Sequence, residues 1–186
     1  SNYAYAYAKR MLDIQSQAYH DQYGCNFVTA VPNNLYGEHD NFHLEKSHVI
    51  PSVIRKIYEA KQAKAGVLKL WGTGSPLREF TYSGDLAKII VNTFNTYEKE
   101  YPINVGCPGE YTIRDLAEMI KDILRYDGFL LWDTRLPNGQ IRKPSDNSKF
   151  LEANHPDVFE YIDFRKALEK TCIWFVKNYP NVRGVE

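Results

Sequence analysis

Apolar and polar positions along the chain follow two periodicities, one of a helix and one of a strand. Apolar residues recur at helical spacing in five stretches, at about 3–23, 51–65, 85–94, 113–126 and 164–179. Short apolar runs that predict strands lie at 25–31, 67–71, 78–82, 102–105 and 129–132. Helices that alternate with short strands are typical of an α/β fold with a parallel or mixed sheet.

Local signals add detail to three of these boundaries. Thr112 stands three residues before Asp115, which predicts a capping box at the start of a helix. The turn residues 72–76 between two short strands predict a hairpin-like unit. Residues 33–47 are rich in Asn, Asp, Gly and His, and an irregular loop of this length is usually functional or disordered.

Composition limits the classes of function. A chain of 186 residues with 44% apolar residues fits one domain of ordinary size. Its formal net charge is zero, which disfavours nucleic acid or an anionic membrane as the main partner. The sequence has no apolar run long enough for a membrane span, and its three cysteines are widely spaced. We therefore expect a reducing, cytoplasmic location.

The first candidate for chemistry is a tyrosine–lysine pair near the start of the chain. Tyr5 and Lys9 are four residues apart in a predicted helix, so their side chains share one face. A cation beside a phenol favours loss of the phenolic proton, so the pair could transfer protons. The same spacing also occurs by chance on helix surfaces, and the spacing alone does not decide between the two interpretations.

The second candidate is the histidine-bearing stretch before the second predicted helix. His39 and His43 have the spacing of two metal ligands, but no HExxH pattern is present and the residues between them disfavour a helix. His48 stands just before a helix start, where an imidazole could act as a general acid or base. The alternative is a solvated loop histidine.

The third candidate is a set of residues suited to a nucleotide. Trp71 could stack on a flat heterocycle, and Arg78 and Lys143 could bind phosphate oxygens. Packing for the ring and solvation for the two cations are the alternatives.

Seven segments occur in an order that points to a family. They are YAYAKRM, AVPNNLYGEHDNF, SHVIP, LWGTGSPLREF, INVG, TIRDLAE and PNGQIRKPSDNSK, followed by a closing helix with Trp and Phe. This series resembles the carboxyl-terminal portion of the GDP-L-fucose synthases, which are extended short-chain dehydrogenase/reductases. The resemblance implies the back portion of a Rossmann-type doubly wound parallel sheet, with a smaller α/β substrate-binding domain.

The resemblance also implies a reaction. It is the epimerisation of GDP-4-keto-6-deoxy-D-mannose at two carbons beside the ketone, followed by reduction of the ketone with NADPH to give GDP-L-fucose. By resemblance, Tyr5 is the proton donor to the reduced oxygen, Lys9 assists it and holds the nicotinamide ribose, and His48 is the acid/base of epimerisation.

Binding residues follow from the same resemblance. Those expected to hold NADP(H) are Tyr5, Lys9, Pro32, Asn33, Asn34, Leu35 and His48. Those expected to hold the GDP-sugar are Lys56, Trp71, Arg78, Asn138 and Lys143. Lys56 stands where some members have Arg, and Asn138 stands where Asp is common, so the contacts at these two positions differ from the family pattern.

The implied domain organisation is discontinuous. Residues 1–32 and 85–106 are expected to form the rest of an NADP-binding Rossmann domain, and 33–84 and 107–186 the sugar-nucleotide domain. The chain begins with Ser1 and has no Gly-rich phosphate loop between a strand and a helix, so we expect a truncated or processed chain that is inactive alone. A homodimer is also implied. The alternatives are another sugar-nucleotide epimerase or dehydratase, or a non-catalytic dimerisation or interaction fragment.

Overall fold

The structure is a computed structural model that describes residues 3–97, 101–153 and 160–185. The described helices are α1 (Tyr3–Tyr23), α2 (Val49–Gln62), α3 (Ser83–Thr96), α4 (Ile113–Leu124), α5 (Ser148–Ala153) and α6 (Phe164–Asn178). The described strands are β1 (Ala30–Pro32), β2 (Asn34–Tyr36), β3 (Val67–Trp71), β4 (Leu77–Tyr82), β5 (Ile103–Val105), β6 (Glu110–Thr112) and β7 (Phe129–Asp133). The α/β fold class predicted from the pattern is confirmed.

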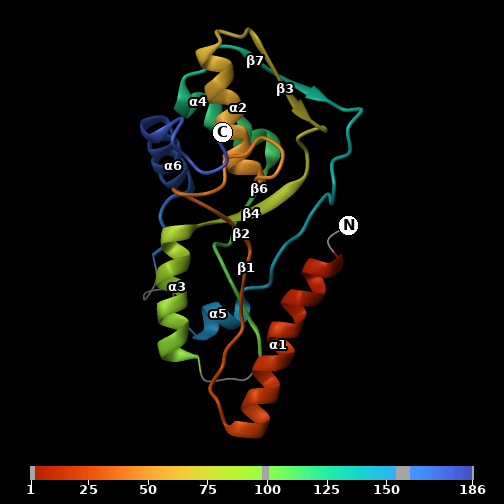
Figure 1. The fold of residues 1–186 in the computed structure, drawn as a ribbon, viewed down its shortest axis with the longest axis vertical. Helices are drawn as coiled ribbons and strands as arrows, with labels where there is room; N and C mark the ends of the chain where they lie inside the picture. The colour runs from red at the N-terminus through yellow and green to blue at the C-terminus, as the bar shows by residue number, and fades with distance from the viewer. Residues whose placement is uncertain (1–2, 98–100, 154–159, 186) are drawn as a thin grey trace.

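Three small sheets connect these elements. Strands β1 and β5 pair in parallel, as do β3 and β7, while β4 pairs in parallel with β2 and antiparallel with β6. Figure 1 shows an elongated molecule with α2, α4, α6, β3 and β7 in one half, and α1, α3, α5 and β1 in the other. Strands β2 and β4 lie at the middle, where the two halves meet (Figure 1).

The predicted hairpin between residues 67 and 82 is wrong. Strand β3 pairs with β7 from Val67↔Phe129 to Trp71↔Asp133, whereas β4 joins a different sheet. Gly72 and Gly74 adopt left-handed backbone angles (φ 72° and 74°) in the turn between them, which leads the chain away from β3. The parallel pairing with β7 leaves Leu70 of β3 in the core beneath α2. In a hairpin, β4 would have taken the place of β7 beside β3.

The predicted strand at 25–31 is shorter than expected and includes the proline that was expected to end it. Strand β1 is limited to the length of β5, because its three residues pair with Ile103, Asn104 and Val105 in turn. Strand β2 lies inside the stretch 33–47 that was expected to be irregular, and α5 and β6 were not predicted. All three are short elements that depend on pairing or packing with distant residues, which local periodicity does not report.

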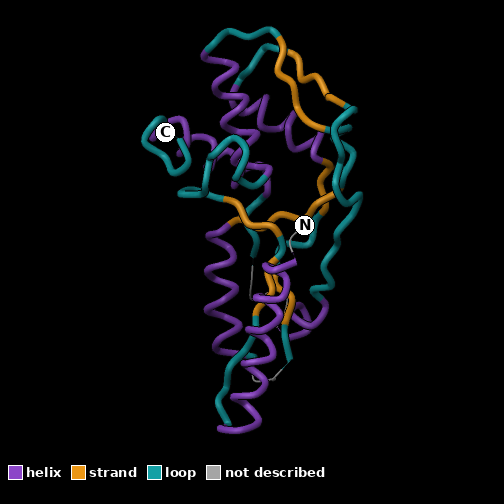
Figure 2. The backbone as a smooth tube through the Cα atoms, turned by 45° about the vertical axis from the view of Figure 1, so that its right-hand side comes forward, coloured by secondary structure: helices purple, strands orange, loops and turns teal. Residues whose placement is uncertain are grey.

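Each half of the molecule has its own buried cluster. The larger one packs α2, α4 and α6 around fully buried residues such as Ile54, Ile120 and Phe175. The smaller one joins α3 and α5 to β5 through Ile89, Val105 and others. Helix α1 has the predicted bounds, but none of its described residues is buried, and Figure 2 shows it standing along the lower part of the molecule.

Several smaller expectations can be compared with the structure. The capping box is confirmed, since the Thr112 hydroxyl accepts from the Asp115 amide at 3.0 Å and donates to its carboxylate at 2.7 Å. Cys25, Cys107 and Cys172 are all free thiols. Among the described helices, none is long and apolar enough to span a bilayer.

Alkaline solution should destabilise the fold in part through Tyr161. Burial, with smaller effects of Cys107 and Asp85, raises the pKa of this phenol from 10.0 to about 12. Between pH 10 and pH 12 the folded chain therefore retains a proton that the unfolded chain has lost, so the stabilisation present below pH 10 falls as the pH rises. In Tyr161→Phe, we expect the free energy of unfolding to fall less steeply over this range, by about 1 kcal/mol between pH 10 and pH 11.

Urea titrations of both proteins at intervals from pH 8 to pH 11 would measure the difference in slope. Burial also raises the pKa of Cys172 to about 12, and both proteins share that contribution, so it cancels in the comparison. Tyr161→Phe also loses the hydrogen bond from the Tyr161 hydroxyl to the Gly106 carbonyl (3.0 Å). This loss lowers the free energy of unfolding equally at every pH below 10, so it does not alter the slope there. Equal slopes in the two proteins would contradict the prediction.

Candidate functional site

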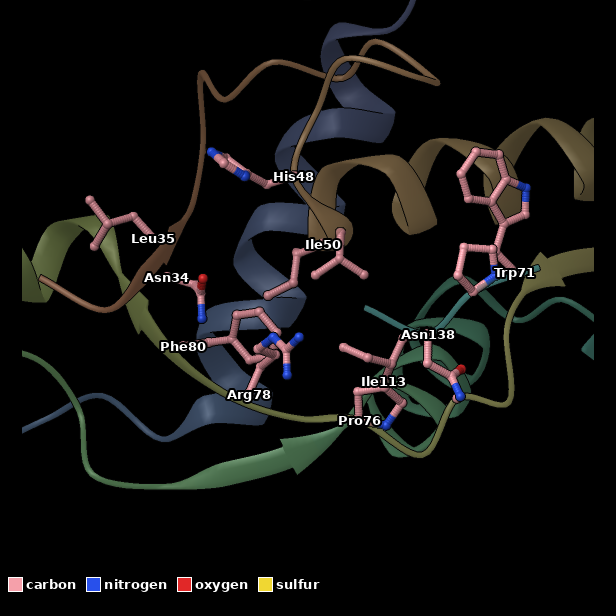
Figure 3. Close-up of a pocket in the computed structure, with 13 residues that line it drawn as sticks. Asn34, Leu35, His48, Ile50, Trp71, Pro76, Arg78, Phe80, Ile113 and Asn138 are labelled. Carbon is pink, nitrogen blue, oxygen red and sulfur yellow. The ribbon is translucent and has the colours of Figure 1, made fainter. Parts of the chain in front are cut away.

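A pocket of about 280 Å³ lies between the start of α2, strand β4 and the turn that follows β3. Six residues that the sequence singled out line it: Asn34, Leu35, His48, Trp71, Arg78 and Asn138. Figure 3 shows His48, Asn34 and Leu35 at one end, Trp71 and Asn138 at the other, and Arg78 between them. The pocket therefore brings an imidazole, a guanidinium and an indole into one elongated space.

His48 reaches this pocket because it is the N-cap residue of α2. Its backbone is extended (φ −71°, ψ 167°), and its side chain makes no capping hydrogen bond to its own helix. The imidazole is therefore not used in capping the helix, and His48 lines the pocket at the end that also contains Asn34 and Leu35 (Figure 3).

The loop before His48 is held by hydrogen bonds from several directions. The Ser52 hydroxyl donates to the Leu44 carbonyl at 3.2 Å. Arg55 donates to the carbonyls of Phe42 (3.1 Å) and Gly184 (2.7 Å), which joins the loop to the carboxyl-terminal residues. These contacts fix the approach of the chain to His48, even though most of the loop has no regular structure.

The two other histidines of this loop have structural partners. His43 accepts the backbone N–H groups of Glu45 and Lys46 through Nδ1, each at 3.1 Å. The His39 ring packs on Trp174 with 4.5 Å between ring centroids. The part of the chain that the structure describes contains no group of three or more His, Cys, Asp or Glu residues arranged to hold a metal ion.

The far end of the pocket is aromatic and cationic. Trp71 is 68% exposed, and Lys56 of α2 places its ammonium 5.7 Å from the centroid of the indole. Burial lowers the pKa of Lys56, and the nearby Glu45 partly opposes this shift. Lys56 does not line the pocket itself, so it contacts the pocket through Trp71.

Arg78 and Asn138 are both held by hydrogen bonds. The Arg78 guanidinium donates to the carbonyls of Leu77 (2.6 Å) and Gln140 (2.7 Å). The Asn138 side-chain oxygen accepts from the backbone N–H of Thr73 at 2.7 Å and from its hydroxyl at 3.1 Å. The turn after β3 and the segment around Asn138 therefore support each other beside the indole.

The remaining candidate residues lie outside this pocket. Tyr5 and Lys9 are on the exposed surface of α1, with the Lys9 ammonium 5.7 Å from the centroid of the Tyr5 ring. The amino end of α1 lies at the height of β2 and β4 in both views (Figures 1 and 2). Pro32, Asn33 and Lys143 are not among the lining residues either, although Pro32 and Asn33 directly precede β2.

The pocket also has walls that were not named individually from the sequence. They are Val49, Ile50, Gly74, Pro76, Phe80, Ile113 and Pro137. Each belongs to one of the ordered segments quoted above, so the signal existed at the level of segments. The sequence does not show which residues of a segment point into the pocket. For Phe80, for example, this depends on the parallel pairing of β2 with β4.

Comparisons with known proteins agree with this geometry. Residues 1–106 match the family model described as the NAD dependent epimerase/dehydratase family. The chain is 43% identical over 185 residues to the GDP-L-fucose synthase of Dictyostelium discoideum, and 40% identical over 178 residues to a probable GDP-L-fucose synthase 1 of Oryza sativa. These alignments cover 98% and 96% of this chain.

A solved structure is similar over nearly the whole chain. The GDP-L-fucose synthetase of Naegleria fowleri, described as bound to NADP, superposes with a TM-score of 0.93 at 38% identity and covers 98% of this chain. The chain spans 57% of the length of the Dictyostelium relative, 53% of the Oryza relative and 58% of the Naegleria structure.

Proposed function

The chain belongs to the NAD dependent epimerase/dehydratase family, and we propose that it forms the sugar-nucleotide-binding part of a GDP-L-fucose synthase. The proposal is supported above all by the pocket, whose chemistry changes from one end to the other in the order that a sugar nucleotide requires. Its relatives carry names that specify GDP-L-fucose, which supports guanine as the base.

In this proposal, the two ends of the pocket take the two ends of the ligand. The indole of Trp71, backed by the Lys56 ammonium, offers a flat face to the guanine base. Arg78 is in the middle, where its planar guanidinium suits the diphosphate. Asn138 lies beside the base end, and Lys143 would approach the phosphates from outside the lining of the pocket.

The sugar would then lie against His48, Asn34 and Leu35. Epimerisation beside a ketone requires a group that removes a proton from carbon and a group that returns one to the opposite face. His48 has an imidazole that is not engaged in capping and lies in the pocket, so it is the proposed acid/base. Tyr5 is the proposed donor to the ketone oxygen during reduction, with Lys9 beside it.

The described residues fit one end of a nicotinamide cofactor. Pro32 is the last residue of parallel strand β1, and Asn33, Asn34 and Leu35 follow it, at the carboxyl end of the strand, which is where open α/β sheets bind such ligands. With Tyr5, Lys9 and His48, they would hold the nicotinamide end of NADP(H), which supplies the hydride for reduction when bound. Among the described residues, no glycine-rich turn joins a strand to a helix start, since Gly72 and Gly74 connect β3 to β4.

We further propose the cytoplasm as the location and a homodimer as the assembly of the whole enzyme. The exposed apolar and aromatic side chains of α1 support an assembly that covers this helix. The proposed boundary between the cofactor and substrate units follows the sequence expectation, with 1–32 and 85–106 in the first and 33–84 and 107–186 in the second.

Calorimetric titration of this chain with GDP-mannose and UDP-glucose tests the proposal. We expect binding of the guanine nucleotide and weaker binding of the uracil nucleotide. Arg78→Ala should weaken GDP-mannose binding at least about tenfold, because hydrogen bonds to a charged group contribute about 1.5–3 kcal/mol. The control is Arg165→Ala, which removes an exposed arginine side chain at the start of α6.

Tighter binding of UDP-glucose would support a different sugar-nucleotide enzyme of the same family. If the chain binds neither nucleotide, or if the two arginine variants bind equally well, the proposal is wrong and the non-catalytic interaction fragment becomes the better interpretation.

A further inference from the structure

Strand β4 has two faces with different surroundings. Arg78 and Phe80 face the pocket, whereas Glu79 and Thr81 point to the opposite side because side chains alternate along a strand. Glu79 is only 5% exposed and Thr81 is fully buried. A buried carboxylate is unusual unless its oxygens are hydrogen-bonded, so the partners of Glu79 are informative.

Glu79 bonds two chain segments at once. Its carboxylate accepts the Ser145 backbone N–H at 3.1 Å and the Ser145 hydroxyl at a shorter distance. It also accepts from the Asn33 side-chain amide at 3.4 Å. In addition, its backbone carbonyl accepts from the Asn34 side chain at 2.7 Å. Asn34 lines the pocket, so Glu79 supports a pocket wall without lining the pocket itself.

The neighbouring Thr81 completes the network. Its hydroxyl donates to the Asn33 side-chain oxygen at 2.6 Å and accepts the backbone N–H of Cys107 at 2.7 Å. Asn33 also donates to the Cys107 carbonyl at 3.2 Å. A buried polar network in which the members are mutually hydrogen-bonded is rigid, and it specifies one arrangement of the segments it joins.

The location of the network explains what it joins. Asn33 directly follows β1, and Cys107 follows β5 by two residues, so both lie at the carboxyl ends of the parallel pair. Ser145 belongs to the segment that also carries Asn138 at the base end of the pocket. Glu79 therefore links the β1–β5 pair, the wall containing Asn34, and the segment containing Asn138.

We propose that Glu79 is a positioning residue that sets the sugar end of the pocket, because its side chain ties Ser145 to Asn33, the residue that directly precedes Asn34. The inference rests on the proposed function, because it assigns the sugar to the end lined by Asn34 and His48. Two donors of Ser145 and one of Asn33 reach the same carboxylate oxygen of Glu79. A glutamine can supply that oxygen from its amide, so the test uses alanine, which removes the acceptor and leaves these donors unpaired.

The test compares GDP-mannose with GDP, titrated calorimetrically into this chain. Glu79→Ala should weaken binding of GDP-mannose about fivefold or more, while binding of GDP changes less than about twofold. The expected signature is therefore a smaller ratio between the two affinities, because only the ligand with a sugar contacts the displaced wall. Ser145→Ala removes one donor of the same link and should shift the ratio in the same direction by a smaller factor.

Glu110→Ala is the matched control. Glu110 holds the Ser145 segment through Arg142, with bonds of 2.9 and 2.6 Å, but it does so from β6. This variant should leave the affinity ratio unchanged, because an ion pair of this exposure contributes little.

The outcomes separate the two proposals. An unchanged ratio in Glu79→Ala, or an equal loss of affinity for both ligands with a lower melting temperature, overturns the positioning role alone. If Glu79→Ala does not fold, the ratio in Ser145→Ala decides in the same way. If the unmodified chain binds neither ligand, both the proposed function and this inference are wrong.

Discussion

A chimera that joins this chain to the preceding residues of the Dictyostelium discoideum relative should lose about 10²–10⁴-fold of its turnover when Tyr5 is replaced by phenylalanine. Phenylalanine retains the ring that lies 5.7 Å from the Lys9 ammonium but removes the hydroxyl that would protonate the ketone oxygen. The measurement is NADPH oxidation with GDP-4-keto-6-deoxy-D-mannose as substrate. We expect kcat to fall much more than KM rises, because the lost interaction belongs to the transition state.

Tyr7→Phe provides the control on the same helix. Tyr7 is exposed like Tyr5, and its ring packs on Tyr3 with 4.5 Å between centroids, so this variant removes a hydroxyl without touching the Tyr5–Lys9 pair. Its turnover should equal that of the unmodified chimera. Full turnover in Tyr5→Phe would contradict the assigned role and favour a non-catalytic role for this helix.

Phe175→Ala should destabilise the fold by about 3–5 kcal/mol. Phe175 is fully buried and contacts three rings: Phe42 at 4.6 Å, Tyr58 at 5.5 Å and Tyr179 at 5.5 Å between centroids. Alanine would leave a cavity among side chains that cannot all move to fill it. Because typical domains are stable by about 5–15 kcal/mol, the loss should lower the urea midpoint strongly.

The exposed Phe94 of α3 is a matched control for this substitution. Phe94 is 84% exposed, so Phe94→Ala should change the free energy of unfolding by about 0.5 kcal/mol or less. Equal midpoints for the two variants would show that α6 does not belong to the core. If Phe175→Ala loses GDP-mannose binding at urea concentrations below its midpoint, where it is still folded, Phe42 transmits the change to the loop before His48.

The helices were largely predictable from the sequence because their signals are local. Helix α1 has the expected bounds, and the capping pair Thr112 and Asp115 marks the start of α4. A cap, a stop residue and an apolar stripe all lie within one short stretch of chain. The exposure of α1, which has no buried residue among those described, was not predictable, since it depends on which distant residues cover the helix.

The strands were less predictable because each depends on a partner. Nothing near residues 67–71 indicates that β3 pairs with β7, about 60 residues later, rather than with the nearby β4. Strands β2 and β6 contain three residues each, and only their pairing with β4 identifies them. Their position in the fold, and not their composition, makes them strands.

The site was predictable as a set of segments but not as a geometry. His48, Trp71, Arg78 and Asn138 lie on separate segments of the sequence and line one pocket in the structure. The sequence did not indicate that Lys56 lies behind Trp71, because the contact depends on the packing of α2 against β3. The burial of Glu79 was not predictable either, since a carboxylate beside Arg78 in a strand suggests an ordinary surface charge.

The alternation of side chains along β4 has a consequence for changing which sugars the pocket accepts. Residues on the pocket face act on the ligand directly, so substitutions there alter charge and shape at the point of contact. Substitutions on the opposite, buried face shift a whole wall of the pocket and leave every ligand-contacting group chemically intact. Under the proposed function, directed evolution toward a new sugar should therefore vary both faces of this strand, because a library restricted to contacting residues would omit positions such as Glu79.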